Sequence, residues 1–260
     1  MYQKLLVETD PRGVAHVTIN RPEVSNAFND ELMTELAVAF RALGEDAAVR
    51  VVVLTGAGRN FCAGGDIAWM KGNLAASRAE RIAGSQLVAD MLWAVNDCPK
   101  PVIARVNGAA FGGGAGLACA ADVTVAAQSA KFALSEVRIG LIPANIAPFV
   151  VRRIGEANAR RFGLSGLVFT AAEAASVGLV HNLAADDALD AAVEAEIAHF
   201  LQAAPEAIAQ TKALLAYVAH HEDEAIKAYT PTALADAWET ECGREGIATF
   251  LEKRPPSWRP

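Results

Sequence analysis

Two glycine-rich turns constrain this chain more than any other feature of its sequence. Residues 61–67 (Phe-Cys-Ala-Gly-Gly-Asp-Ile) and 107–117 (Asn-Gly-Ala-Ala-Phe-Gly-Gly-Gly-Ala-Gly-Leu) each follow a β-branched apolar run, at 51–54 and 102–106, and each leads into a predicted helix. Glycine lets a ligand approach the backbone closely, and a helix start leaves N–H groups unpaired. Two such turns side by side predict an oxyanion hole, in which paired N–H donors on one carbonyl oxygen would stabilise an enolate.

Either turn taken singly is equally compatible with tight packing or with phosphate binding. A dinucleotide site is excluded, because Gly112, Gly113, Gly114 and Gly116 do not follow an unbroken G-x-G-x-x-G and no acidic residue ends a second strand about 20 residues later. The sequence also lacks a G-x-x-x-x-G-K-[ST] phosphate loop and a G-x-S-x-G nucleophile elbow. The prediction therefore depends on the pair of turns.

The order of predicted elements indicates an α/β fold with a largely parallel sheet. Residues 15–20 alternate like a half-buried strand, and Asn29 is expected to cap a helix whose apolar face comprises Leu32, Leu36, Phe40 and Leu43. Strand, turn and helix then recur until about residue 160.

Beyond residue 160 the sequence predicts helices and no further strands. Thr170 and Glu173 form a capping box, and segments rich in Ala, Leu and Glu follow at 186–203, 205–220 and 223–242. We therefore expect a core at residues 1–195 and a C-terminal helical region at 196–260.

Four motifs, in this order along nearly the whole chain, resemble the enoyl-CoA hydratase/isomerase (crotonase) family. They are residues 20–28 (Asn-Arg-Pro-Glu-Val-Ser-Asn-Ala-Phe), the two glycine turns, residues 132–141 (Phe-Ala-Leu-Ser-Glu-Val-Arg-Ile-Gly-Leu) and residues 250–254 (Phe-Leu-Glu-Lys-Arg). The resemblance implies a spiral of ββα units, an acyl-CoA substrate of the kind found in fatty acid metabolism, and a C-terminal oligomerisation region that builds homotrimers or dimers of trimers. It implies no cofactor besides the coenzyme A of the substrate.

The resemblance assigns the catalytic roles to three residues. From the sequence alone, Glu136 could equally be a carboxylate that satisfies N–H groups at a helix start. In the family, the glutamate at this position is the general acid and base, and partial burial would raise its pKa toward a useful range. The N–H groups of Gly65 and Gly113 match the two oxyanion donors.

One departure leaves two activities open. Typical hydratases of the family carry a second glutamate where this chain has Gly116, so we expect a gap there, which solvent must fill if Glu136 alone performs hydration. A one-base 3,2-enoyl-CoA isomerase needs only one carboxylate and is the alternative to a hydratase. Residues 141–152 are similar to the methylglutaconyl-CoA or terpenoid-glutaconyl-CoA hydratase-like branch, which favours hydration. In that branch Arg138 or Arg152 would be a candidate to bind a distal substrate carboxylate, and the alternative for either is a solvated or salt-bridged arginine.

The resemblance also predicts contacts with coenzyme A. The predicted residues are Val24, Ala63, Asp66, Gly112, Gly116, Phe250 and Lys253. Three of them have an ordinary structural interpretation as well: Asp66 could cap a helix, Phe250 could pack on a helix face, and Lys253 could be a solvated charge.

Composition limits the remaining classes of function. A net charge of −7 disfavours a nucleic-acid partner, although a catalytically silent CoA-binding or RNA-binding protein stays an alternative of another class. The four cysteines do not have the spacing of a zinc site, and Cys62 is interpreted as a packed side chain. His220 and His221 are interpreted as solvated, so no metal is expected. Without a signal-like or membrane-spanning stretch, the protein is predicted to be cytoplasmic.

Overall fold

The computed structural model describes residues 2–259 and contains two sheets. The six-stranded sheet has the order β1-β2-β3-β4-β6-β9, in which β1 is antiparallel to β2 and the other neighbours are parallel. The three-stranded sheet has the order β5-β7-β8. The strands are β1 Leu5–Thr9, β2 Val14–Ile19, β3 Val51–Gly56, β4 Val102–Val106, β5 Ala109–Phe111, β6 Val123–Ala127, β7 Lys131–Ala133, β8 Val168–Thr170 and β9 Asn182–Ala184.

Helices follow most strands, as the α/β prediction requires. The helices are α1 Asp30–Glu45, α2 Ile67–Ala75, α3 Arg78–Asn96, α4 Gly113–Ala120, α5 Ala147–Ser165, α6 Ala171–Ser176, α7 Leu189–Leu201, α8 Pro205–Val218, α9 Asp223–Glu239 and α10 Glu241–Glu252, with short 3-10 helices at Pro22–Val24, Glu136–Ile139 and Asp186–Ala188. Asn29 accepts a 3.0 Å hydrogen bond from the N–H of Leu32, which confirms the predicted cap of α1. The predicted capping box at Thr170 and Glu173 is also present.

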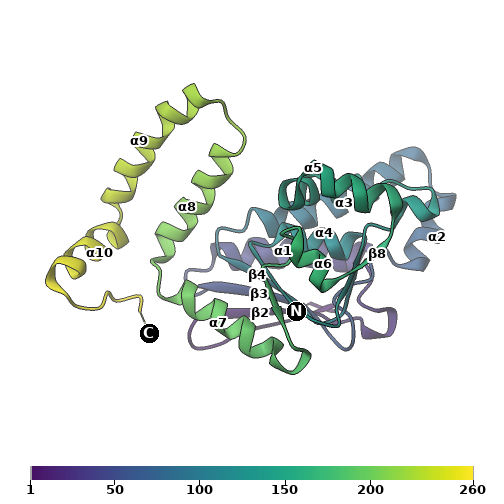
Figure 1. Ribbon diagram of the computed structural model, residues 1–260, viewed down its shortest axis with the longest axis horizontal. Helices are drawn as coiled ribbons and strands as arrows, with labels where there is room; N and C mark the ends of the chain where they lie inside the picture. Colours follow the sequence, from purple (N-terminus) through teal and green to yellow (C-terminus); the bar gives the residue numbers. More distant parts are fainter. Residues whose placement is uncertain (1, 260) are drawn as a thin grey trace.

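The large sheet is buried on both faces, which explains its continuous β-branched runs. In β3, Val52 and Leu54 belong to the core cluster shared with α1, α3 and α4, whereas Val51 and Val53 belong to a second cluster with α7. Figure 1 shows α7 on one side of the sheet and α1, α3 and α4 on the other. The carboxyl ends of the parallel strands β3 and β4 are thereby fixed next to each other.

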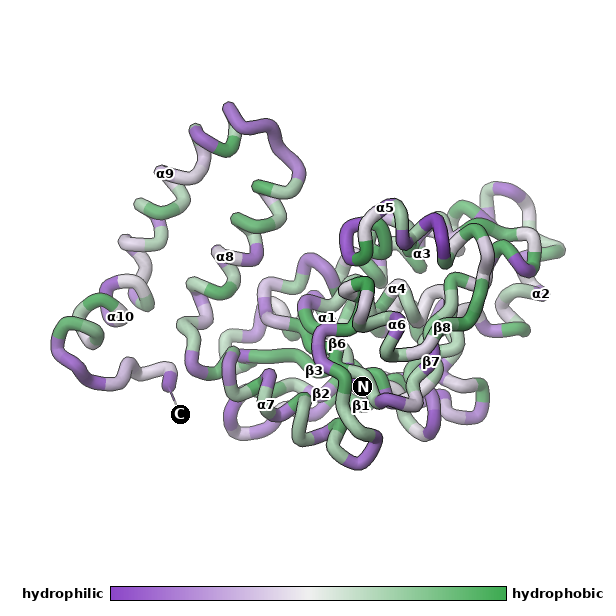
Figure 2. The backbone as a smooth tube through the Cα atoms, in the orientation of Figure 1, coloured by the Kyte–Doolittle hydropathy of each residue, from purple (hydrophilic) through white to green (hydrophobic). Residues whose placement is uncertain are grey.

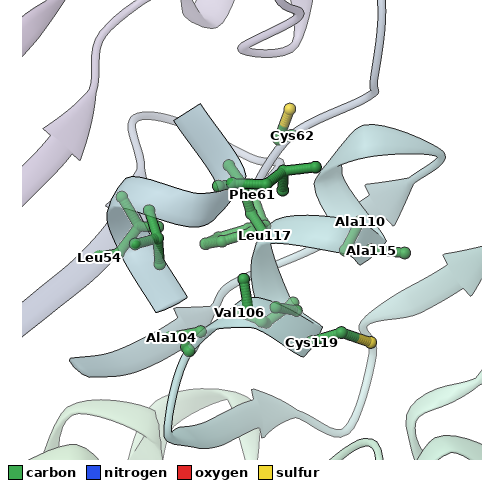
Figure 3. Close-up of a cluster of buried hydrophobic side chains, with 14 of the residues drawn as sticks. Leu54, Phe61, Cys62, Ala104, Val106, Ala110, Ala115, Leu117 and Cys119 are labelled. Atoms are coloured by element: carbon green, nitrogen blue, oxygen red, sulfur yellow. The ribbon is translucent and has the colours of Figure 1, made fainter. Parts of the chain in front are cut away.

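The missing side chain at Gly114 lets α4 lie close against the first glycine turn. A Cβ added to Gly114 would lie 2.1 Å from the carbonyl oxygen of Cys62, so only glycine fits there. Figure 3 shows Phe61 and Cys62 of the first turn packed in one cluster with Leu117 of α4. The two turns therefore rest on a common apolar base.

The expectation of no strands after residue 160 is wrong. Strand β8 pairs with β7, and β9 pairs in parallel with β6 to complete the large sheet. Both strands have only three residues, too few for an alternating pattern to be visible in the sequence.

The C-terminal helices separate from the core after α7. The expected boundary between residues 195 and 196 falls inside α7, where Val193, Ile197 and Leu201 all pack on the sheet. Helices α8, α9 and α10 extend away from the core (Figure 1), and Figure 2 shows hydrophobic and hydrophilic residues alternating along them. Large apolar side chains are exposed on all three, namely Leu215, Val218, Leu234, Trp238, Ile247, Phe250 and Leu251. No helix within residues 2–259 is long and apolar enough to cross a bilayer.

Candidate active site

Backbone hydrogen bonds join the two glycine turns. The N–H of Cys62 donates to the carbonyl oxygen of Ala109, and the N–H of Phe111 donates to the carbonyl oxygen of Cys62, both at 3.0 Å. Gly64 has a φ of +91°, and a Cβ there would lie 2.9 Å from the carbonyl oxygen of Phe111 and 3.6 Å from the amide nitrogen of Gly113. Glycine at position 64 is thus what allows the second turn to lie against the first.

Two N–H groups at this junction have no internal acceptor. The residues on either side of Gly65 are paired with Phe28: the N–H of Phe28 donates to the carbonyl oxygen of Gly64, and the N–H of Asp66 donates to the carbonyl oxygen of Phe28. Within residues 2–259 the N–H of Gly65 itself has no acceptor. Gly113 is the first residue of α4, where helical geometry leaves the N–H free, and in the same part of the chain it too has no acceptor. Both residues line one cavity, so the predicted pair of donors is brought together.

Phe28 explains why position 113 must be glycine. A Cβ added to Gly113 would lie 2.3 Å from Cε2 of the Phe28 ring, which is buried. A Cβ added to Gly65 would instead meet only side chains, at 3.6–3.7 Å, in Met70 and Trp69. The two donors therefore differ in how much substitution they tolerate.

Glu136 lies beside the second turn. It begins the short 3-10 helix Glu136–Ile139 that follows β7, and β7 is anchored by a 2.8 Å hydrogen bond from the N–H of Gly112 to the carbonyl oxygen of Ala133. A Cβ added to Gly112, whose φ is +50°, would lie 2.9 Å from Oε1 of Glu136. The missing side chain at position 112 therefore makes room for the carboxylate.

The environment of the Glu136 carboxylate favours its neutral form. Among the described residues, its Oε2 is the one buried side-chain oxygen or nitrogen without a hydrogen-bond partner. Burial raises the pKa of Glu136, and its own backbone N–H lowers the pKa by less. The residue preceding the 3-10 helix, Ser135, makes no side-chain capping bond. A carboxyl group with a raised pKa beside two free N–H donors can exchange protons with a bound thioester.

The cavity itself has a volume of about 310 Å³. Its walls come from the two turns, from α2 and α3, and from the segment 139–146, with a mostly apolar lining that includes Trp69, Met70, Val88, Ile139, Leu141 and Ile142. The polar side chains of the lining are Glu136, Ser135, Ser85, Asn145 and Arg81. Such a cavity suits an acyl chain with one polar end.

The expectation of a solvent-filled gap at Gly116 is wrong. Gly116 is buried, and a Cβ there would lie 2.3 Å from Cγ2 and 2.8 Å from Cβ of Ile146. Ile146 directly precedes α5 and is itself buried, so hydrocarbon fills the place that a second glutamate would take. Gly116 consequently does not line the cavity, although it was predicted to be a binding residue.

The other predicted binding residues divide into two groups. Ala63 and Gly112 line the cavity, but Val24 and Asp66 do not. Asp66 caps α2 through Ala68 and forms a 2.8 Å ion pair with Arg21. Burial opposes ionisation of Asp66, yet these hydrogen bonds outweigh it and lower its pKa. Its structural interpretation as a helix cap is therefore confirmed.

The C-terminal residues and the candidate arginines lie elsewhere. Phe250 and Lys253 are exposed at the end of α10, on the side of the molecule away from α2, and one chain does not bring them to the cavity. Arg152 lies over the ring of Trp93, with 5.1 Å between its Cζ and the ring centroid, and Arg138 does not line the cavity.

Sequence reasoning missed the side chains that α3 contributes to the cavity. Arg81, Ser85 and Val88 are spaced by four and three residues and therefore share one face of α3. The start of α3 is fixed by a capping box at Ser77, which is readable in the sequence. The spacing after that box could have identified this face, but nothing in the sequence shows that it meets the glycine turns.

The remaining predictions concern cysteine and histidine side chains that take no part in the proposed proton transfer. Cys62 is completely buried, and burial raises its pKa to about 12, as expected for a packed side chain. Among residues 2–259, no three Asp, Glu, His or Cys side chains cluster in a way that could hold a metal ion. His220 and His221 are exposed.

Comparisons with known proteins identify the family and the fold of this chain. The family model for enoyl-CoA hydratase/isomerase matches residues 9–260. A Rhodobacter capsulatus protein named "Probable enoyl-CoA hydratase" is 39% identical over 251 residues, which cover 94% of this chain and 93% of that protein. The structure of Pseudomonas aeruginosa AtuE superposes with a TM-score of 0.96 at 40% identity, and the match covers 99% of this chain and 100% of the AtuE chain. An enoyl-CoA hydratase from Shewanella pealeana has a TM-score of 0.95 at 33% identity, covering 99% and 97%. The predicted fold is thereby confirmed, and the chain is a member of the enoyl-CoA hydratase/isomerase (crotonase) family.

Proposed function

We propose that this protein hydrates a 2-enoyl-CoA thioester to a 3-hydroxyacyl-CoA. The observation that carries the proposal is the meeting of Glu136 with two unpaired N–H donors, those of Gly65 and Gly113, in one cavity. The substrate is the acyl-CoA itself, and the chemistry uses no additional cofactor.

The reaction follows from the roles of these three residues. The thioester oxygen accepts hydrogen bonds from both N–H groups, so negative charge that develops on it is stabilised by donors already in position. Glu136 takes a proton from water as the oxygen bonds to C3, and then gives that proton to C2 as the enolate returns to the thioester. Burial raises the pKa of Glu136, which favours a group that must both accept a proton and release it again.

We also propose that the active enzyme is a homotrimer or a dimer of trimers. The support is the set of apolar side chains exposed on α8, α9 and α10, which a monomer leaves in water. In such an assembly Phe250 and Lys253 of one chain would be available to the coenzyme A of another.

Isomerisation is the second candidate. The observation that favours it is Ile146 above Gly116, because the described part of the chain then brings Glu136 as the sole carboxylate to the cavity. A 3,2-enoyl-CoA isomerase moves one proton between C4 and C2 of a single enolate and adds no water. One carboxylate is sufficient for that transfer.

A panel of acyl-CoA thioesters in ¹⁸O-labelled water separates the two activities. A hydratase removes the ultraviolet absorbance of a conjugated 2-enoyl-CoA and incorporates ¹⁸O into the product. An isomerase raises that absorbance from a 3-enoyl-CoA and incorporates none. The panel includes branched and glutaconyl-type thioesters, since residues 141–152 resemble the branch that acts on them. Isomerisation without ¹⁸O uptake on every substrate would refute the proposal of a hydratase.

A further inference from the structure

A second polar pair lies in the same cavity as Glu136. The side-chain amide of Asn145 donates a 2.9 Å hydrogen bond to Oγ of Ser85, and both residues are partly buried. Asn145 comes from the segment before α5, whereas Ser85 comes from α3. The bond therefore ties together two walls of the cavity that Glu136 also lines.

This pair retains unused hydrogen-bonding capacity. The amide of asparagine can make four hydrogen bonds, and within residues 2–259 the side chain of Asn145 makes one. Among the described residues, Glu136 Oε2 is the one side-chain oxygen or nitrogen that is both buried and without a hydrogen-bond partner. Asn145 Oδ1 has no partner either, so it is not a buried atom. Asn145 Oδ1 is thus accessible to water and free to accept a hydrogen bond.

The position of the pair follows from the packing of Ile146. Because Ile146 fills the space above Gly116, no second carboxylate can hold a water there. Asn145 is the residue immediately before Ile146, so the packing that closes this space also fixes the amide at the cavity wall. Hydration requires the attacking water to be oriented as well as deprotonated, and orientation contributes to the rate independently of proton transfer.

We propose that Asn145 orients the water that attacks C3, and that Ser85 is the positioning residue that holds Asn145. This role rests on the proposed hydration. As the water oxygen bonds to C3, the C2=C3 electron pair moves into the enolate and Glu136 takes one water proton. The other hydrogen stays on the oxygen and is hydrogen-bonded to Asn145 Oδ1. Glu136 then protonates C2, and the amide neither gains nor loses a proton.

The test compares two reactions of the same enzyme. Hydration of a 2-enoyl-CoA needs the oriented water, whereas exchange of the C2 hydrogens of butyryl-CoA with D₂O needs only Glu136 and the two N–H donors. We expect Asn145→Ala to lower kcat for hydration by about 10²-fold, with little change in KM and with C2 exchange close to that of the wild type. Retained exchange also shows that the variant is folded.

Ser85 provides the second arm of the test. Ser85→Ala should lower kcat for hydration, while Ser85→Thr, which keeps a hydroxyl group, should restore most of it. The matched control is Asn158→Ala, because Asn158 also makes one 2.9 Å side-chain bond, to the carbonyl oxygen of Ile154, but does not line the cavity. This control should hydrate at the wild-type rate.

Three results would overturn the role. Hydration at the wild-type rate by Asn145→Ala refutes the role of Asn145 and leaves the proposed function intact. A parallel loss of hydration and C2 exchange shows that Asn145 supports the structure instead. Exchange without any hydration by the wild-type enzyme overturns the proposed function, and the water-orienting role with it.

Discussion

Replacing Gly116 by alanine tests whether Ile146 packs against helix α4, which contains Gly116, as tightly as the structure shows. The added Cβ would lie 2.3 Å from Cγ2 of Ile146, well inside van der Waals contact, so one of the two residues must shift. Overpacking of this kind costs about 1–3 kcal/mol. For a chain of this size, that cost lowers Tm by about 2–12 °C.

The contact is isolated by a double-mutant cycle with Ile146→Ala. The single Ile146→Ala change leaves a cavity and costs about 2–5 kcal/mol. In the double variant the 2.3 Å contact with Cγ2 is removed, while the 2.8 Å contact with Cβ of residue 146 remains. The combined loss should therefore be smaller than the sum of the single losses by about 1–3 kcal/mol. Free energies of unfolding are measured by urea denaturation at one fixed protein concentration, because assembly makes stability depend on concentration.

The control is Gly72→Ala. Gly72 lies inside α2, and among the described residues no heavy atom lies within 4 Å of an added Cβ. Alanine there should stabilise the protein by about 0.5–1 kcal/mol, through helix propensity alone. If Gly116→Ala and Ile146→Ala destabilise additively to within about 0.5 kcal/mol, the two side chains do not share this space and the assignment of Ile146 is refuted.

Four further predictions follow from the site. Glu136→Gln should lower kcat by about 10²–10⁴-fold with KM nearly unchanged, and wild-type turnover in steady-state assays would contradict the assignment of the base. Because burial raises the pKa of Glu136, the acid limb of the pH–rate profile should lie above the reference carboxyl value of about 4.3, and a limb at or below that value would argue against burial. A raised pKa means that ionisation of Glu136 destabilises the folded state, so Glu136→Gln should be more stable than the wild type at pH 7. Calorimetry should show this difference in stability vanishing below about pH 4.3, where the carboxyl group is protonated in the folded and the unfolded state. Gly65→Pro removes an N–H donor at the turn glycine that has room for a side chain. If circular dichroism shows the variant to be folded, its kcat should be lower by about 10²-fold or more, whereas full activity would exclude that N–H from the oxyanion hole.

The sequence was sufficient for the features that depend on local chemistry. The strands before the glycine turns, the cap at Asn29 and the capping box at Thr170 are where short-range patterns predict them. Roles that depend on distant packing were not accessible. Nothing in the local sequence around Gly116 shows that Ile146 covers it, and strand β9 is defined by its pairing with β6 and has no pattern of its own.

The same distinction applies to the cavity. The glycine turns and Glu136 carry recognisable motifs, whereas Ser85 and Asn145 meet only because α3 and the segment before α5 are folded against each other. A pair of polar residues separated by 60 positions has no signature in the sequence.

Because the two proposed oxyanion donors are main-chain N–H groups of turns joined by hydrogen bonds, exchanging a side chain does not remove the groups themselves. Gly64, Gly113 and Gly114 leave no room for a side chain, so a larger residue at any of them would shift the turns. At Gly65, where a side chain has room, only proline would delete the donor itself. Glu136, Asn145 and Ser85, in contrast, can each be exchanged by a single substitution. Such a division lets the machinery that stabilises an enolate persist while the groups that decide what the enolate reacts with are altered one at a time, a direct physical route from one thioester reaction to another.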